Sequence, residues 1–239
     1  MGYICFCTSF YCSKKDCKTK ESVIKYSGVD LEFEKTILSG VNLDIKKGEF
    51  VYLIGKTGSG KSSLLKSIYA DIRIEVGSAY VCGFTLNGLK KSKIPLLRRK
   101  LGIIFQDFQL LKDRSVYDNL AFVLKATGWK DKKAMNERIL QALDDVGLLM
   151  KANEQACDLS EGEMQRVSIA RAIVNQPELI LADEPTGNLD PITSEEIVQL
   201  LMEINKKHGT TVLMATHDYI VLDKFRAKVI ACEDGKIVS

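Results

Sequence analysis

Residues 55–62 are the segment that most constrains the fold of this 239-residue chain. They read Gly-Lys-Thr-Gly-Ser-Gly-Lys-Ser, which fits the phosphate-loop pattern G-x4-G-K-[ST]. Such a loop joins a strand to a helix, and the apolar run at 50–54 and the helical periodicity after residue 60 predict both. Glycines let backbone N–H groups turn toward phosphate oxygens, and the helix N-terminus adds positive potential. The residues expected to contact the nucleotide are Gly55, Lys56, Thr57, Gly58, Ser59, Gly60, Lys61, Ser62 and Ser63.

Two adjacent carboxylates supply the second half of a phosphoryl-transfer site. Asp183 and Glu184 directly follow the apolar run at 179–182, where a buried strand is expected to end. Asp183 is expected to hold Mg²⁺, and Glu184 to polarise the attacking water as a general base. His217 follows the next predicted strand, at 210–215, so it is expected to reach the γ-phosphate. With Lys61 placed beside the phosphates, the predicted catalytic groups are Lys61, Glu184 and His217.

Strands and helices alternate along the rest of the chain, which predicts an α/β fold with a mostly parallel sheet covered on both faces. A helical insertion is predicted at 115–149 from its 3.6-residue apolar period. Strands are predicted at 23–26, 29–33, 37–45, 50–54, 79–82, 101–105, 179–182, 210–215 and 228–232. Further helices are predicted after residue 60 and at 161–174 and 193–206.

Charge and hydropathy exclude two classes of protein. Lys and Arg number 34 against 31 Asp and Glu, and a net charge of +3 is too small for a dedicated nucleic-acid binder. The longest stretch without a charge is the 14 residues 76–89, shorter than the roughly 18 apolar residues of a membrane span. The basic segment 90–100 has six Lys or Arg and no acid; it fits either a solvated surface or contact with anionic lipid headgroups.

Cysteines are distributed unevenly. Four of the seven lie within the first seventeen residues, at spacings that do not match a structural zinc site. Residues 1–22 are expected to form a disordered tail ahead of one domain at 23–239. Cys82, Cys157 and Cys232 are expected to be small core residues. Reduced thiols and the lack of an export signal favour the cytoplasm.

Further motifs, in order along residues 23–239, resemble those of the ATP-binding-cassette (ABC) ATPase family. The resemblance implies a P-loop NTPase fold with a RecA-like core, an antiparallel β subdomain and a helical subdomain at about 107–175. It also implies these roles: Phe33 stacks on adenine; Gln106 senses Mg²⁺; Ser160, Gly162 and Glu163 belong to the signature loop; Asp190 crosses the dimer interface; His217 is the switch histidine.

The same resemblance implies that a homodimer hydrolyses ATP. Two copies pair head to tail, so that each ATP lies between the phosphate loop of one copy and the signature loop of the other. Mg²⁺ is then held by Ser62, Gln106 and Asp183. Two residues differ from the family's usual pattern: Glu161 stands where glycine is usual, directly after Ser160, and Glu163 stands where glutamine is often found. The negative charge of Glu161 is expected to weaken ATP-driven closure of the dimer.

Residues 182–190 resemble a subgroup that contains cell-division, lipoprotein-releasing and macrolide-efflux ATPases, and residues 93–120 look most like the cell-division members. That resemblance implies a separate polytopic membrane partner, control of cell-wall hydrolysis, and a cytoplasmic location at the inner face of the membrane. Lipoprotein release or efflux is the alternative. A soluble ABC ATPase acting on nucleic acid or ribosomes is a third class, disfavoured by the single phosphate loop.

Overall fold

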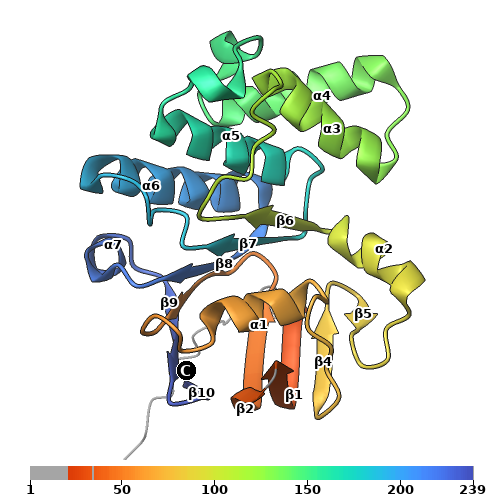
Figure 1. Cartoon of the computed structure of the whole chain (residues 1–239), viewed down its shortest axis with the longest axis vertical. Coiled ribbons are helices and arrows are strands. Elements are labelled where there is room, and N and C mark those ends of the chain that lie inside the picture. Colours follow the sequence, from red (N-terminus) through yellow and green to blue (C-terminus); the bar gives the residue numbers. More distant parts are fainter. Residues whose placement is uncertain (1–20, 34, 239) are drawn as a thin grey trace, which may run out of the picture.

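The computed structural model describes residues 21–33 and 35–238, which form two β-sheets and a layer of helices (Figure 1). The strands are β1 (Ser22–Phe33), β2 (Lys35–Lys46), β3 (Phe50–Ile54), β4 (Ser78–Val81), β5 (Phe84–Thr85), β6 (Leu101–Ile104), β7 (Leu179–Asp183), β8 (Thr211–Thr216), β9 (Lys228–Glu233) and β10 (Lys236–Val238). The α-helices are α1 (Lys61–Ile68), α2 (Ile94–Arg98), α3 (Val116–Thr127), α4 (Lys132–Asp145), α5 (Glu161–Ile173), α6 (Pro191–His208) and α7 (Tyr219–Lys224). Short 3-10 helices span Lys91–Lys93, Leu149–Lys151 and Ala156–Asp158.

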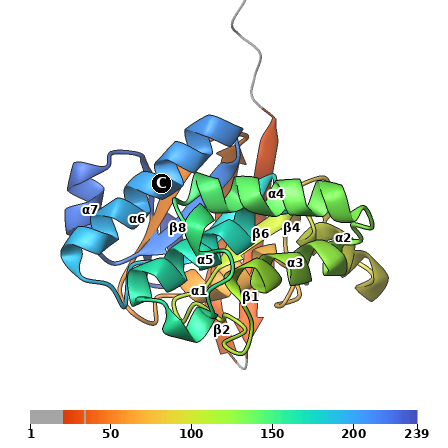
Figure 2. The same cartoon turned by 90° about the horizontal axis from the view of Figure 1, so that it is seen from above.

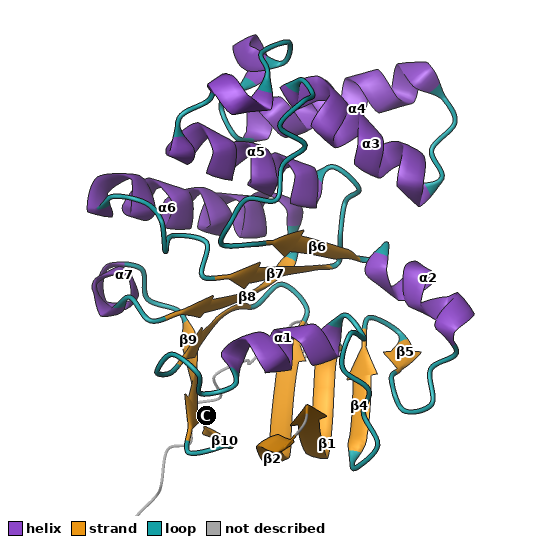
Figure 3. Cartoon of the chain, in the orientation of Figure 1, coloured by secondary structure: helices purple, strands orange, loops and turns teal. Residues whose placement is uncertain are grey.

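The central sheet has the strand order β10-β9-β3-β8-β7-β6, and all its pairs are parallel except β10 with β9. Side chains alternate between its two faces: along β7, Ile180 and Ala182 face the helices, whereas Leu179 and Leu181 face α1 and the second sheet. The second sheet is antiparallel, in the order β2-β1-β4-β5 (Figure 3). The predicted parallel sheet, covered on both faces, is therefore confirmed.

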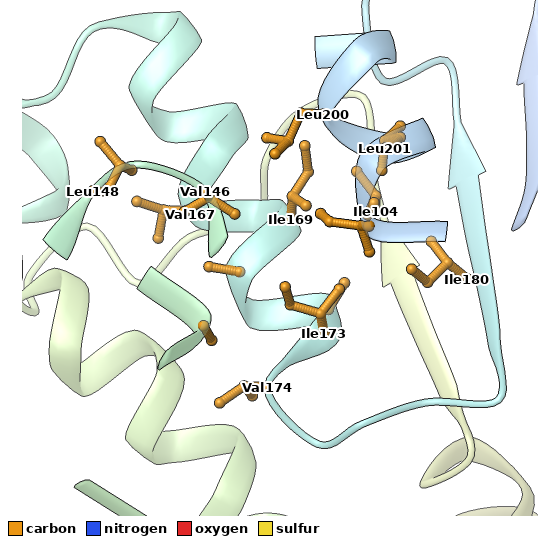
Figure 4. Packing of buried hydrophobic residues seen from close by; sticks show 14 of the residues in the cluster. Ile104, Val146, Leu148, Val167, Ile169, Ile173, Val174, Ile180, Leu200 and Leu201 are labelled. Atoms are coloured by element: carbon orange, nitrogen blue, oxygen red, sulfur yellow. The ribbon is translucent and has the colours of Figure 1, made fainter. Parts of the chain in front are cut away.

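The helical layer packs on one face of the central sheet through α5. In Figure 4, Ile169 and Ile173 of α5 lie among Ile104 of β6, Ile180 of β7 and Leu200 of α6. All five side chains are buried, so this apolar contact couples β6, the strand that precedes Gln106, to α5, the helix that begins directly after Ser160. Seen from above, α3 and α4 extend from α5 on the same side of the sheet (Figure 2).

The caps of α6 show why this helix begins and ends where it does. Asp190 accepts hydrogen bonds from the backbone N–H groups of Ile192 and Thr193, at 3.0 and 3.1 Å. Pro191 occupies the first turn, where its missing N–H costs nothing. Gly209 ends the helix in a left-handed conformation. The predicted range of 193–206 is therefore two residues short at each end.

Some elements differ from the sequence-based predictions. The runs at 23–26 and 29–33 belong to one strand, β1, because pairing with β2 continues on both sides of Gly28. At Gly28, which has φ +58°, the register of that pairing shifts between Tyr26 and Val29. Three short elements, β5, α2 and β10, were not predicted. The basic segment forms the Lys91–Lys93 turn and α2 with exposed charges. Residues 1–20, which include the four N-terminal cysteines, lie outside the described residues.

Candidate nucleotide-binding site

The phosphate loop connects β3 to α1, and Lys61 is folded back over it. Its side chain is 4% exposed, and its Nζ donates to the carbonyl oxygens of Gly55 and Lys56 at 2.8 and 3.2 Å. Such a buried ammonium needs partners, and backbone carbonyls supply two of them. Gly60 directly precedes α1, so the free N–H groups of the first helical turn open toward the loop. The loop therefore presents a positive charge and backbone donors in one place.

Close packing explains why this loop needs its first glycine. A Cβ atom on Gly55 would lie 2.4 Å from the carbonyl oxygen of Cys232, at the end of the loop's neighbouring strand β9. The Cys232 thiol donates to the carbonyl oxygen of Ser59 at 2.8 Å, which ties the middle of the loop to the same strand. Ser59 Oγ is buried without a hydrogen-bond partner among the described residues. Such an orphaned hydroxyl fits a loop built to surround phosphate oxygens.

The two predicted carboxylates reach the loop from the end of β7. Ser62 Oγ donates to Asp183 Oδ1 at 3.1 Å. Burial raises the pKa of the Asp183 carboxyl above its ordinary value, and the bond from Ser62 opposes that rise. Glu184 Oε1 lies 3.4 Å from Lys61 Nζ, and its Oε2 lies 3.1 Å from His217 Nδ1. The fold thus brings together the three predicted catalytic groups and two of the three predicted metal ligands.

Glu184 is aimed by its backbone. Its φ of +48° is left-handed, which a residue with a side chain adopts only where the surroundings hold it. Its N–H donates to the carbonyl oxygen of Ala215 in β8 at 3.0 Å, and that bond fixes the turn. A hollow of about 470 Å³ adjoins this turn and is lined by residues that include Glu184, Gly187 and His217. The carboxylate therefore borders space where a substrate could lie.

Gln106, the third predicted metal ligand, follows β6 and lies beside the turn after Glu184. A Cβ atom on Gly187 would be 2.9 Å from Gln106 Nε2, and Asn188 Nδ2 donates to the carbonyl oxygen of Gln106 at 2.9 Å. Arg171 of α5 donates to the carbonyl oxygens of the next turn, at Phe108 and Gln109. Sequence reasoning missed Arg171, since nothing local marks a side chain that bonds 62 and 63 residues away.

The signature segment forms a separate group. Ser160 caps α5: its Oγ accepts from the N–H of Glu163 at 3.3 Å, and Glu163 Oε2 accepts from the N–H of Ser160 at 3.0 Å. A Cβ atom on Gly162 would meet Thr193 Cγ2 at 2.9 Å, and Thr193 Oγ1 donates to Asp190. Close packing at Gly162 thus places the signature loop against the start of α6, and no hydrogen bond of the described residues joins Ser160 to the phosphate loop.

Two further predictions concern single side chains. Phe33 is the last residue of β1, but the placement of its side chain lies outside the described part of the structure. The cysteines at 82 and 232 are buried, as predicted, whereas the prediction for Cys157 is wrong: its side chain is exposed. Cys157 stands in a single 3-10 turn whose buried residue is Ala156, so the next side chain turns toward solvent.

Comparison with known proteins identifies the class. A family model described as ABC transporter matches residues 38–187, more than half of the chain, which therefore belongs to this family. CbiO1 from Clostridium perfringens, part of an ABC transporter complex, superposes with a TM-score of 0.85 at 28% identity, covering 92% of this chain and 88% of that one. The phosphate loop, the carboxylate pair and this fold together define an ABC-type ATPase.

Proteins similar in sequence point to one group within the ABC family. The Cell division ATP-binding protein FtsE of Streptococcus pneumoniae is 44% identical over 219 residues, 91% of this chain and 94% of the relative. FtsE of Mycobacterium tuberculosis is 48% identical over 201 residues, 84% and 86% of the two chains. The dimeric ABC transporter cassette MJ0796 superposes with a TM-score of 0.80 at 35% identity, covering 90% of this chain and 97% of that one. Another MJ0796 dimer is in a post-hydrolysis state, bound to ADP and phosphate.

Proposed function

We propose that this chain is the ATP-hydrolysing subunit of an FtsE-like cell-division complex that drives a separate polytopic membrane protein of the FtsX type. The observation that carries the proposal is the convergence on two adjacent carboxylates: Lys61 and His217 lie within ion-pair distance of Glu184, and Ser62 hydrogen-bonds to Asp183. The similarity to FtsE proteins over nearly their whole length supports the cell-division role.

ATP binding would rest on the phosphate loop. Backbone N–H groups of residues 55–62 and the N-terminus of α1 attract phosphate oxygens, because both present unpaired donors and positive potential. The ammonium of Lys61 would exchange its two backbone carbonyl partners for the β- and γ-phosphates. Phe33 would stack on the adenine. The buried, unpartnered Oγ of Ser59 supports this assignment.

The chemistry of the donors fits Mg²⁺. A serine hydroxyl, a carboxylate and an amide oxygen are hard ligands of the kind this ion prefers, and Ser62 and Asp183 already lie 3.1 Å apart. Ser62, Asp183 and Gln106 would hold the ion. When bound, Mg²⁺ supplies positive charge to the phosphate oxygens. A cation here would also compensate the Asp183 carboxylate, whose pKa burial now raises.

Hydrolysis would depend on Glu184. Its carboxylate would accept a hydrogen bond, and then a proton, from the water that attacks the γ-phosphate. His217 Nδ1 lies 3.1 Å from Glu184 Oε2, so the imidazole orients that carboxylate and remains close to the reacting phosphate. The strained backbone of Glu184 keeps the carboxylate at the edge of the hollow next to Gly187. These contacts support general-base catalysis.

A second copy would complete the site. Ser160 and Glu163 hydrogen-bond to each other, and Gly162 packs closely against Thr193 at the start of α6. This loop would therefore face the ATP of a partner copy. Asp190 stands beside them at the same surface. Two copies would pair head to tail, with ATP between the phosphate loop of one and the signature loop of the other. The dimeric MJ0796 cassettes support this arrangement.

The membrane partner would dock on the helical subdomain at about 107–175. A hollow of about 210 Å³ between β6 and α3 is lined by residues that include Phe105, Gln109 and Arg171, directly beside Gln106. A cytoplasmic segment of the partner bound there would be displaced by any change in the position of Gln106. No helix among the described residues is long and apolar enough to cross a bilayer. We propose that the chain lies at the inner face of the membrane, held there by its partner.

Replacing Glu184 with Gln tests the proposal. We expect Glu184→Gln to lose ATP turnover while ATP still binds and favours the dimer, because the amide keeps the shape of the side chain but accepts no proton. The exposed Glu137→Gln in α4 is the matched control and should turn over ATP normally. Tagged Glu184→Gln protein, incubated with ATP and native membranes in detergent, should also retain a polytopic membrane protein. Unchanged turnover in Glu184→Gln would refute the catalytic assignment.

A further inference from the structure

Lys151 makes a contact that connects it to the signature serine. It ends the 3-10 turn Leu149–Lys151, and its Nζ lies 2.6 Å from Glu163 Oε1 and 3.4 Å from Glu154 Oε2. The other oxygen of Glu163, Oε2, is 3.0 Å from both the N and the Oγ of Ser160. One carboxylate therefore links the ammonium of Lys151 to the residue that caps α5.

The first turn of α5 carries an unusual amount of negative charge for a surface expected to meet a phosphate. Glu161 is exposed directly after Ser160, and Glu163 lies two residues further along. Acidic side chains stabilise a helix N-terminus, but they also repel an incoming anion. Lys151 neutralises one of the two. The hydrogen bond from Lys151 is the largest cause that lowers the pKa of the Glu163 carboxyl, so that carboxylate stays ionised and paired.

We propose that Lys151 is a positioning residue for ATP-driven dimerisation: it balances the charge of Glu163 and fixes that carboxylate where it orients Ser160. The inference rests on the proposed function, in which Ser160 faces the ATP of a second copy. It also explains how the signature loop accommodates Glu161. With Lys151 in place, the turn presents one net negative charge to the phosphate instead of two.

The pair is partly open to solvent, with 35% of the Lys151 side chain and 27% of the Glu163 side chain accessible. Exposed ion pairs contribute little to folding stability, so Lys151→Gln should melt at the wild-type temperature. Its effect should fall on the dimer. Because each dimer has two signature loops, we expect Lys151→Gln to raise the dissociation constant of the ATP-dependent dimer roughly tenfold. At high salt, where charges are screened, the difference from wild type should be smaller.

The experiment measures the dimer dissociation constant by analytical ultracentrifugation with ATP, in a Glu184→Gln background that does not consume it. Lys151→Gln should weaken the dimer, Lys151→Arg should keep it close to wild type, and the exposed Lys132→Gln in α4 is the charge-matched control. The double variant Lys151→Gln with Glu163→Gln restores the charge balance and still offers an oxygen to the N–H of Ser160. It should recover most of the affinity.

The outcomes separate this inference from the proposed function. If Ser160→Ala weakens the dimer but Lys151→Gln does not, Lys151 has no positioning role while the signature loop still acts across the interface. If neither variant changes the dimer, the proposed use of the signature loop is itself wrong. If Lys151→Gln weakens the dimer and the double variant is no better, Lys151 only anchors the loop, and the charge argument is overturned.

Discussion

Replacing Arg171 with Met should loosen the turn that follows Gln106. Arg171 Nη2 donates to the carbonyl oxygen of Phe108 at 2.7 Å, and its Nη1 donates to that of Gln109. Both acceptor residues have left-handed backbones, with φ of +59° and +48°. The guanidinium therefore holds two strained residues in place from the neighbouring helix α5.

The expected cost follows from opposing contributions. Each hydrogen bond from a charged donor contributes about 1.5–3 kcal/mol, so losing two would cost about 3–6 kcal/mol. Gln109 is exposed, so its carbonyl oxygen regains water and that half of the cost is largely recovered. The balance is a loss of about 1.5–3 kcal/mol in the free energy of unfolding.

Urea unfolding of Arg171→Met measures that loss, and steady-state ATP turnover measures its consequence. We expect turnover to fall further than the lost stability explains, because Gln106 is no longer held beside Gly187. Arg171→Lys keeps the charge but not the forked geometry, so its stability and turnover should lie between those of the wild type and Arg171→Met. A variant Arg171→Met with wild-type stability and turnover would show that these hydrogen bonds do not hold the turn.

Two more predictions concern the phosphate loop and its carboxylate. Gly55→Ala should destabilise the fold and abolish ATP binding, because its Cβ would lie 2.4 Å from the carbonyl oxygen of Cys232. The control is Gly88→Ala, which is also at positive φ but has open space around it. This control should lose only about 1 kcal/mol in the free energy of unfolding and bind ATP normally. Burial raises the pKa of the Asp183 carboxyl, so the folded state holds this proton more tightly and stability falls as the pH rises past the ordinary value of 3.8. Asp183→Asn should therefore melt higher than wild type at pH 7, converge with it below that value, and lose Mg²⁺-dependent turnover; equal melting temperatures at pH 7 would contradict the argument.

Much of the fold and site could be predicted because the signals are local. The glycine spacing of residues 55–62 and the carboxylates after the apolar run at 179–182 each lie within a few consecutive residues. In a parallel sheet the carboxyl ends of neighbouring strands share one edge, so Ser62, Asp183 and His217 could be expected to meet. The contacts at 3.1 Å between Ser62 and Asp183, and between Glu184 and His217, confirm that reasoning.

The predictions that were wrong depend on local geometry that the sequence pattern does not record. Cys157 was expected in the core from its apolar neighbours, but a 3-10 turn has too few residues for periodicity to distinguish its faces. The division of β1 into two predicted strands has a similar cause. Gly28 interrupts the alternation that marks a strand, although the pairing with β2 continues past it through a shift in register.

By itself, the sequence determined the class of protein and predicted the catalytic groups, because strand–loop–helix motifs encode phosphate binding within one short segment. Tertiary structure alone decided how those groups are held. The Cys232 thiol bonds to a loop 173 residues away, Arg171 secures the turn after Gln106, and Lys151 balances Glu163. Such contacts arise only when separate elements pack together, since no local pattern records which distant backbone oxygen or carboxylate a side chain will meet.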